Sequence, residues 1–134
     1  MKKAIDYSYY IAMIVLIVWF AYTKGWIFAN FESITPKQAI TLLEKDNNIM
    51  LLDVRTIQEY KGGHLHNAIL IPLSKLEKNL NKLVLYKNKK ILVYCRSGSR
   101  SITASRILEK HGFIPINIKE GIVGLIGAGV QIIK

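Results

Sequence analysis

The chain has 134 residues, a formal charge of +10 and a hydrophobic content of 51%. This length fits one compact domain of about 100 residues with a short extension. A single cysteine excludes an intrachain disulfide and any metal site built on several cysteines. The basic residues are scattered and follow no zinc-finger, helix-turn-helix or RNA-binding pattern, which argues against a nucleic acid partner. They fit a solvated surface, or attraction to small anions or anionic lipid headgroups.

The N-terminal segment carries no charge over residues 7–23 and is continuously apolar over residues 11–21. This length lies at the short end of what crosses a bilayer core of about 30 Å. Tyrosines at its start, and Trp19, Tyr22 and Trp26 towards its end, resemble the aromatic belts of membrane helices. We therefore predict one transmembrane helix that contacts membrane lipid through residues 7–23.

A cleaved secretory signal is the alternative interpretation, because Lys2 and Lys3 precede the apolar stretch. Its best cleavage site, at residues 27–29, is mediocre. The charges that flank the segment leave the membrane orientation open. We divide the chain into a membrane anchor with its connector, residues 1–32, and a folded domain, residues 33–134.

The folded domain alternates short apolar runs with amphipathic segments. The apolar runs are typical of strands covered on both faces, and they lie at residues 49–54, 68–71, 90–94 and 114–118. Capping boxes predict helices that begin at Thr35, Thr56 and Ser74, the last with Leu76, Leu80, Leu83 and Val84 facing inward. Further helices are expected at residues 100–111 and 122–126. This alternation predicts an α/β fold with a mostly parallel sheet and helices on both faces.

The most informative stretch joins the strand at 90–94 to the helix that follows it. The strand ends at Cys95, a short polar loop containing Gly98 follows, and the helix begins near Arg100. In open α/β sheets, ligands bind outside the carboxyl ends of the strands. Cys95 therefore emerges where a site is expected. Taken alone, a cysteine at the end of a buried strand is often only a small hydrophobe.

Three effects favour the thiolate form of Cys95. The loop N–H groups can form an anion-binding nest, and the following helix directs its positive end at the same place. Arg96 and Arg100 add positive charge. A thiolate is the nucleophilic form of cysteine, so these groups predict a nucleophile at neutral pH. The same groups would bind an anionic substrate or stabilise a departing anion.

Two blocks of this sequence resemble the single-domain rhodanese-like sulfurtransferases. The first runs Leu52-Asp53-Val54-Arg55-Thr56-Ile57-Gln58-Glu59-Tyr60-Lys61-Gly62-Gly63-His64-Leu65-His66-Asn67-Ala68, followed by Ile71-Pro72-Leu73. The second is the active-site loop, Val93-Tyr94-Cys95-Arg96-Ser97-Gly98-Ser99-Arg100-Ser101. The resemblance covers residues 34–134 and implies a rhodanese-like α/β fold.

The resemblance also implies a reaction in two displacements. Cys95 would take sulfane sulfur from thiosulfate or another small anionic donor as a persulfide, and pass it to cyanide or a thiol acceptor. The substrate-binding residues would be Arg96, Ser97, Gly98, Ser99 and Arg100. We expect no cofactor. A lone reactive thiol is easily oxidised elsewhere, which favours the reducing cytoplasmic side of the membrane.

Four further polar residues, Asp53, Arg55, Glu59 and His64, are expected to support the site by ordering the neighbouring loops. A catalytic network among them is the weaker reading, because a cysteine thiolate needs no general base. His64 and His66 lack a third ligand at a suggestive spacing, so no metal site is expected.

Two alternatives to the enzyme remain. The first is a membrane-localised sulfur carrier or interaction module that keeps the same pocket. The second is a phosphatase-like hydrolase, which the loop length disfavours: Cys95 to Arg100 is Cys-x4-Arg, whereas related phosphatases and arsenate reductases use Cys-x5-Arg. The chain departs from the family at Asn67, where Gly is usual, and at residues 120–125, which lack a common Trp. We expect a looser C-terminal segment there.

Overall fold

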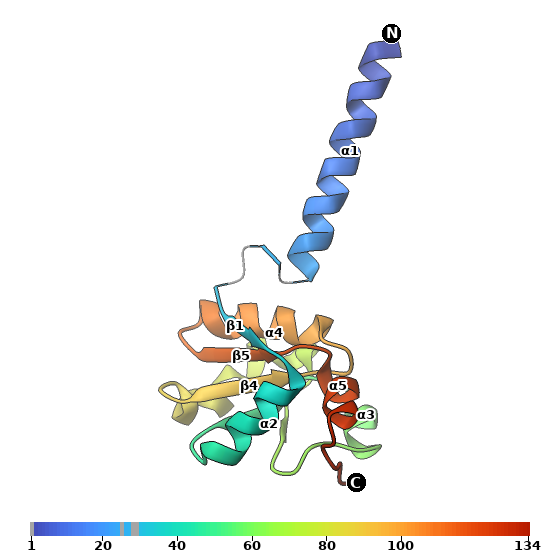
Figure 1. Ribbon diagram of the computed structural model, residues 1–134. Coiled ribbons are helices and arrows are strands. Elements are labelled where there is room, and N and C mark those ends of the chain that lie inside the picture. The colour runs from blue at the N-terminus through green and yellow to red at the C-terminus, as the bar shows by residue number, and fades with distance from the viewer. Residues whose placement is uncertain (1, 25, 28–29) are drawn as a thin grey trace.

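The computed structural model describes residues 2–24, 26–27 and 30–134. An N-terminal helix, α1 (Lys2–Thr23), stands away from an α/β domain (Figure 1). The domain's elements follow in the order β1 (Glu32–Ile34), α2 (Pro36–Lys45), β2 (Met50–Asp53), α3 (Ile57–Lys61), β3 (Ile69–Leu70), η1 (Leu73–Lys75), η2 (Glu77–Tyr86), β4 (Lys90–Tyr94), α4 (Ser99–Lys110), β5 (Ile114–Ile118) and α5 (Gly121–Gly127).

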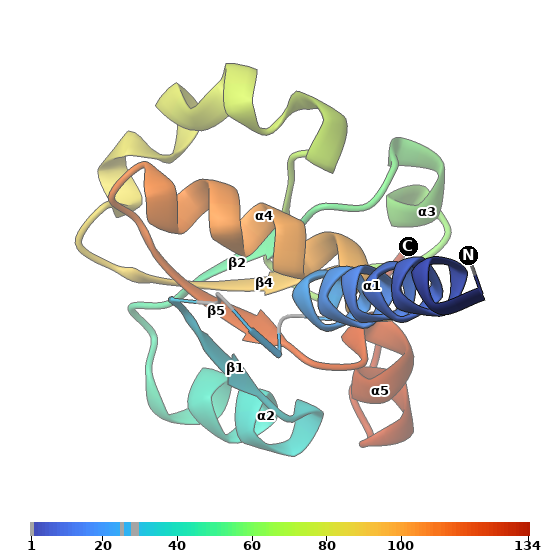
Figure 2. The same cartoon turned by 90° about the horizontal axis from the view of Figure 1, so that it is seen from above.

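The five strands form one parallel sheet in the order β1-β5-β4-β2-β3. Seen from above, α4 and the 3-10 segments η1 and η2 lie on one side of the sheet, and α2 and α5 lie on the other (Figure 2). The predicted α/β fold, with a parallel sheet and helices on both faces, is confirmed.

The alternation of side chains along β4 divides the core into two layers. Ile91, Val93 and Cys95 belong to the cluster that packs against α4 and η2. Leu92 and Tyr94 belong to the cluster beneath α2 and α5. All five are almost completely buried. Because successive strand residues point to opposite faces, this register directs the Cys95 side chain towards the start of α4.

Two of the three predicted capping boxes are present. The Thr35 hydroxyl accepts a hydrogen bond from the Gln38 N–H at 3.2 Å, and the Gln38 side chain accepts one from the Thr35 N–H at 2.9 Å. Thr56 and Glu59 form the same reciprocal pair at the start of α3. These caps satisfy donors at the helix starts that have no partner within the helix.

The third capping box, predicted at Ser74, is wrong. Ser74 lies inside the 3-10 turn η1, and a second 3-10 segment, η2, replaces the predicted α-helix. Non-helical angles at Asn79 (φ −118°, ψ 18°) interrupt η2. The predicted inward face is correct at Leu76 and Leu83, which are buried, but Val84 is 54% exposed. The inward face was predicted from the 3.6-residue period of an α-helix, but a 3-10 helix has about three residues per turn, so different residues face inward.

Strand β1 was also missed, because residues 1–32 were assigned to the anchor and its connector and no strand was predicted before the helix that begins at Thr35. It has three residues, too few for a recognisable alternation, and it is held by parallel pairing with β5.

Helix α1 contains one apolar stretch long enough to cross a membrane, Asp6–Thr23, and none of it is buried. A signal sequence near an N-terminus has the same length and composition. The end of α1 contacts α4 through Arg106, whose Nη2 donates hydrogen bonds to the carbonyl oxygens of Tyr22 (2.6 Å) and Ile27 (3.2 Å). The Arg106 guanidinium also lies 3.9 Å from the centroid of the Tyr22 ring. This contact satisfies a carbonyl at the end of α1 and joins the helix to the domain.

Candidate active site

The loop between β4 and α4 wraps around the sulfur atom of Cys95. The Gly98 N–H donates a hydrogen bond to Cys95 Sγ at 3.0 Å, and the Ser101 hydroxyl oxygen lies 3.6 Å from the same sulfur. The Ser101 hydroxyl in turn donates to the Gly98 carbonyl at 3.1 Å. Cys95 is 1% exposed. The sulfur is therefore enclosed by the loop at the start of α4, with one backbone N–H directed at it.

Gly98 adopts a left-handed conformation with φ at 110°, immediately before α4. A Cβ atom there would lie 3.2 Å from the Glu120 nitrogen. Glycine is therefore the residue that lets the backbone turn its N–H towards the sulfur while passing close to the start of α5.

The first turn of α5 supports the loop from behind. The Ile122 N–H donates to the Cys95 carbonyl at 2.8 Å, and the Val123 N–H donates to the Arg96 carbonyl at 3.2 Å. In a trans peptide the C=O and N–H point in opposite directions. The N–H groups of Arg96 and Ser97 therefore point away from α5. The sequence analysis did not predict that α5 would hold the loop. Gly121, a glycine shortly after the last strand, was the feature that could have indicated this close approach.

Arg100 and Glu59 form an ion pair beside the loop. The Arg100 Nη1 and Nη2 atoms lie 2.7 and 2.9 Å from the two Glu59 carboxylate oxygens. The hydrogen bond from Arg100 lowers the pKa of Glu59 to about 2. Arg100 had been expected to hold the donor anion, and its guanidinium is bound to Glu59 in this structure. The Arg96 side chain is exposed.

Asp53 and Arg55 form a buried ion pair, with Arg55 Nη2 2.6 Å from Asp53 Oδ2. The same Nη2 donates to the Gly63 carbonyl at 2.8 Å. Nearby, the Leu65 N–H donates to the Tyr94 hydroxyl at 3.2 Å. These contacts hold the chain around residues 63–65 against the ends of β2 and β4. The positions of Asp53 and Arg55 fit a structural role, since neither makes a recorded hydrogen bond to the Cys95 loop.

The model of the family described as Rhodanese-like domain matches residues 35–128. The chain belongs to the rhodanese-like domain family. It is 30% identical to a solved rhodanese-like domain protein from Staphylococcus aureus, with a TM-score of 0.69, over 78% of this chain and 100% of that one.

Two relatives that this chain resembles in sequence carry the name of a function. "Putative sulfur carrier protein YrkF" of Bacillus subtilis (strain 168) is 39% identical over 71 residues, which cover 53% of this chain and 37% of YrkF. A tRNA uridine(34) hydroxylase of Buchnera aphidicola subsp. Schizaphis graminum (strain Sg) is 34% identical over 105 residues, which cover 72% of this chain and 34% of that protein. This chain therefore spans little more than a third of either relative.

The remaining residues of the rhodanese-like signature are His64 and Asn67, and the side-chain contacts of His64 lie within its own segment. The His64 ring stacks on Tyr60 with centroids 3.6 Å apart, and its Nδ1 lies 2.8 Å from the Tyr60 carbonyl oxygen. Its backbone pairs with Ile133 through two hydrogen bonds of 2.9 Å. Asn67 has φ at 65°, which explains why glycine is usual at this position. Among the described residues, neither side chain forms a hydrogen bond to Cys95, whose side-chain partners are Gly98 and Ser101.

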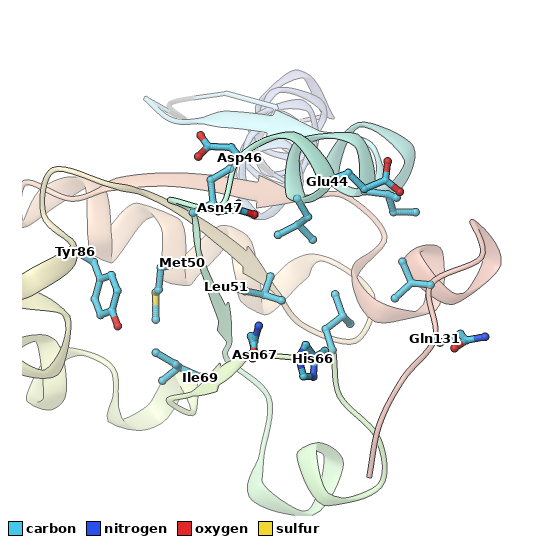
Figure 3. A pocket seen from close by; sticks show the side chains of 15 residues that line it. Glu44, Asp46, Asn47, Met50, Leu51, His66, Asn67, Ile69, Tyr86 and Gln131 are labelled. Atoms are coloured by element: carbon cyan, nitrogen blue, oxygen red, sulfur yellow. The ribbon is translucent and has the colours of Figure 1, made fainter.

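A cavity of about 470 Å³ lies between the end of α2, the β2–β3 edge of the sheet and the C-terminal segment (Figure 3). His66, Asn67 and Gln131 contribute to its wall. Its recorded lining includes no residue of the 95–101 loop, so we place the candidate chemistry at the loop and not in this cavity.

Proposed function

We propose that this chain is a membrane-anchored sulfurtransferase that carries sulfur as a persulfide on Cys95. The observation that carries the proposal is the 3.0 Å hydrogen bond from the Gly98 N–H to Cys95 Sγ, made at the start of α4 in a rhodanese-like fold. An N–H bond and a positive helix end both favour the thiolate, which is the nucleophile in sulfur transfer.

The reaction follows from this arrangement in two steps. The Cys95 thiolate attacks the outer sulfur of thiosulfate, the S–S bond of thiosulfate breaks, and sulfite leaves with the bonding electron pair. The outer sulfur of the Cys95 persulfide is then attacked by cyanide or a thiolate. This second step forms thiocyanate or a new persulfide and returns the Cys95 thiolate. No net oxidant or reductant is consumed.

The loop supplies the groups that would bind the donor. The N–H groups from Arg96 to Arg100 would surround the transferred sulfur, and the exposed Arg96 side chain would attract the anionic donor. Arg100 contributes positive charge while Glu59 fixes its position. The hydroxyl groups of Ser97 and Ser99 are further donors in the same loop.

The anchor and the domain would have separate roles. Residues 1–32 would hold the chain in a membrane through α1, and residues 33–134 would carry out the transfer. A cytoplasmic position is proposed for the domain, because thiol acceptors are abundant and stay reduced there. Protection of the domain from protease added to intact cells would support that position.

A steady-state assay tests the proposal. The full chain, given thiosulfate and cyanide, should produce thiocyanate, and Cys95→Ser should produce none. Ser74→Ala, at an exposed position in η1, serves as the matched control and should keep the wild-type rate. Absence of thiocyanate, with release of phosphate from an aryl phosphate, would contradict the proposal and favour a hydrolase.

A sulfur carrier is the second candidate, and the name of YrkF favours it. A carrier would gain the mass of one sulfur on Cys95 but would show no turnover with small acceptors. Mass spectrometry alongside the thiocyanate assay separates the two.

A further inference from the structure

A basic face of the domain lies on the segment that leads from the end of η1 to the start of β4. Residues 75–90 contain seven charged residues, of which six are lysine and one is Glu77. The lysines are all exposed: Lys75, Lys78, Lys82, Lys87, Lys89 and Lys90. Among the residues that the structure describes, no carboxylate forms an ion pair with any of these lysines. The segment therefore concentrates positive charge that the domain itself does not neutralise.

Two exposed aliphatic side chains lie among these lysines. Val84 is 54% exposed and Leu85 is 87% exposed. Leu76 and Leu83 of the same segment are buried in the core cluster beside the sheet, so they hold η2 on the domain and leave the exposed residues on its outer surface. We call the six lysines together with Val84 and Leu85 the η2 patch. Apolar side chains within a charged rim are typical of the centre of a protein interface.

The η2 patch lies away from the N-terminal helix. Lys87 Nζ is 5.6 Å from the centroid of the Phe113 ring, so the patch adjoins the turn from α4 to β5. Figures 1 and 2 show the yellow turn from η2 to β4 at one side of the domain and α1 leaving the domain at another. A membrane that contains α1 would therefore leave the η2 patch facing water.

The η2 patch also leaves the Cys95 loop uncovered. Strand β4 begins at Lys90, in the patch, and ends at Tyr94, next to Cys95. A strand of this length spans roughly 16 Å. A partner seated on the patch can therefore stay bound while Cys95 reacts.

The side chains of the patch narrow the class of partner. Its lysines attract carboxylates, and Val84 and Leu85 gain from an apolar side chain that removes them from water. The phosphates of a nucleic acid would meet the lysines but leave both aliphatic side chains in water. Nucleic acid sites also commonly supply arginine or aromatic rings to the bases, whereas residues 75–90 contain no arginine and Tyr86 is half-buried.

We propose that the η2 patch binds an acidic protein surface that places an apolar side chain against Val84 and Leu85. The lysines would speed the encounter, and the aliphatic pair would hold the partner in place. This interaction is separate from sulfur transfer, so its test does not depend on turnover.

Binding of a defined peptide tests the inference. The full chain in phosphatidylcholine nanodiscs receives a fluorescein-labelled peptide in which leucines are flanked by glutamates, and fluorescence anisotropy gives the Kd. The affinity should fall about tenfold in Val84→Gln/Leu85→Gln, because apolar burial is lost at unchanged charge. Val123→Gln/Ile126→Gln, which changes two exposed apolar residues of α5, is the matched control and should keep the affinity.

Two further measurements separate the apolar and charged contributions. The same peptide with serine in place of each leucine has equal charge and should bind about tenfold more weakly to the wild-type chain. Lys82→Gln/Lys87→Gln should slow association and reduce the salt dependence of the Kd more than it changes dissociation. Circular dichroism spectra that match the wild type establish that each variant is folded.

Absence of peptide binding, or equal affinity of the wild type and Val84→Gln/Leu85→Gln, would overturn the inference. Amide hydrogen exchange over residues 82–90 locates the contact, and the peptide should slow it. Exchange that slows when phosphatidylglycerol replaces phosphatidylcholine, with no effect of the peptide, would assign the patch to lipid headgroups instead. Tighter binding of single-stranded DNA than of the peptide would assign it to nucleic acid, which also overturns the inference.

Discussion

Single glycines determine the shape of the Cys95 loop. Gly121 has φ at 55°, and a Cβ atom there would lie 2.4 Å from the Cys95 carbonyl oxygen. That carbonyl accepts the Ile122 N–H, so the contact is part of the hydrogen bonding that holds the loop against α5. A side chain at position 121 would push the loop and α5 apart.

Gly121→Ala is therefore expected to destabilise the protein by about 2 kcal/mol or more, through the left-handed angle and the backbone clash. Gly127→Ala is the matched control: it lies in the same helix, has no left-handed angle and would place its Cβ in open space. Alanine there should leave the Tm unchanged or raise it. Thermal melts of the full chain followed by circular dichroism test the pair. Equal melting temperatures would contradict this account of the loop.

Sequence analysis selected the loop that contains Cys95 but not the contacts that hold this loop in place. Strand, loop and helix follow from apolar runs and from Gly98, so Cys95, Gly98 and Arg100 could be selected. The ion pair of Arg100 with Glu59 joins residues 41 positions apart, and no local pattern encodes it.

At the level of elements, the Glu59–Arg100 pair joins α3 to α4 across the site. The folded pKa of Glu59, about 2, lies below its ordinary value of 4.5. Ionised Glu59 therefore stabilises the fold fully above about pH 4.5, and this contribution is lost as the pH falls towards 2. Both side chains are roughly a third exposed, so solvent reduces the contribution to about 1 kcal/mol.

Glu59→Gln should lower the Tm at pH 7 by several degrees, because it removes the ion pair but keeps a side chain that can complete the capping box. Near pH 2 the difference from wild type should disappear. Glu44→Gln, at an exposed position in α2, should show no difference at either pH. A Glu59→Gln difference that persists at pH 2 would show that the charge is not its cause.

The elements also show where sequence patterns fail. The caps at Thr35 and Thr56 are local, and both were predicted correctly. The stretch after Ser74 has the same pattern of residue types but winds into 3-10 turns, because the backbone is already helical at Leu73 and breaks at Asn79. A capping pattern shows that a helix can begin at a residue. Whether an α-helix then forms there depends on tertiary packing.

For the whole molecule, the relation between α1 and the domain is the central feature. The stretch Asp6–Thr23 is apolar and wholly unburied, and exposed apolar surface of this size is typical of a segment that contacts a membrane or a partner. Arg106 joins the end of this helix to α4, so the proposed membrane would lie close to a cavity beside the Cys95 loop.

The double substitution Ile14→Lys/Val18→Lys should release the chain from the membrane, since each lysine at the centre of a span costs about 2.5–3.5 kcal/mol. Val84→Lys/Leu85→Lys changes two exposed apolar residues of the domain in the same way and should leave the chain in the membrane fraction. Ultracentrifugation after alkaline carbonate extraction measures both. Recovery of wild-type chain in the soluble fraction would contradict the anchor.

The most direct test of the account is the mass of Cys95 after brief exposure of the full chain to thiosulfate. The account predicts a gain of about 32 Da, the mass of one sulfur atom, mapped to Cys95 and removed by cyanide. Gly98→Ala, which disturbs the N–H donor to the sulfur, should form this adduct more slowly. An unmodified Cys95 in wild-type protein, with sulfite absent from the solution, would contradict the proposed role of this cysteine.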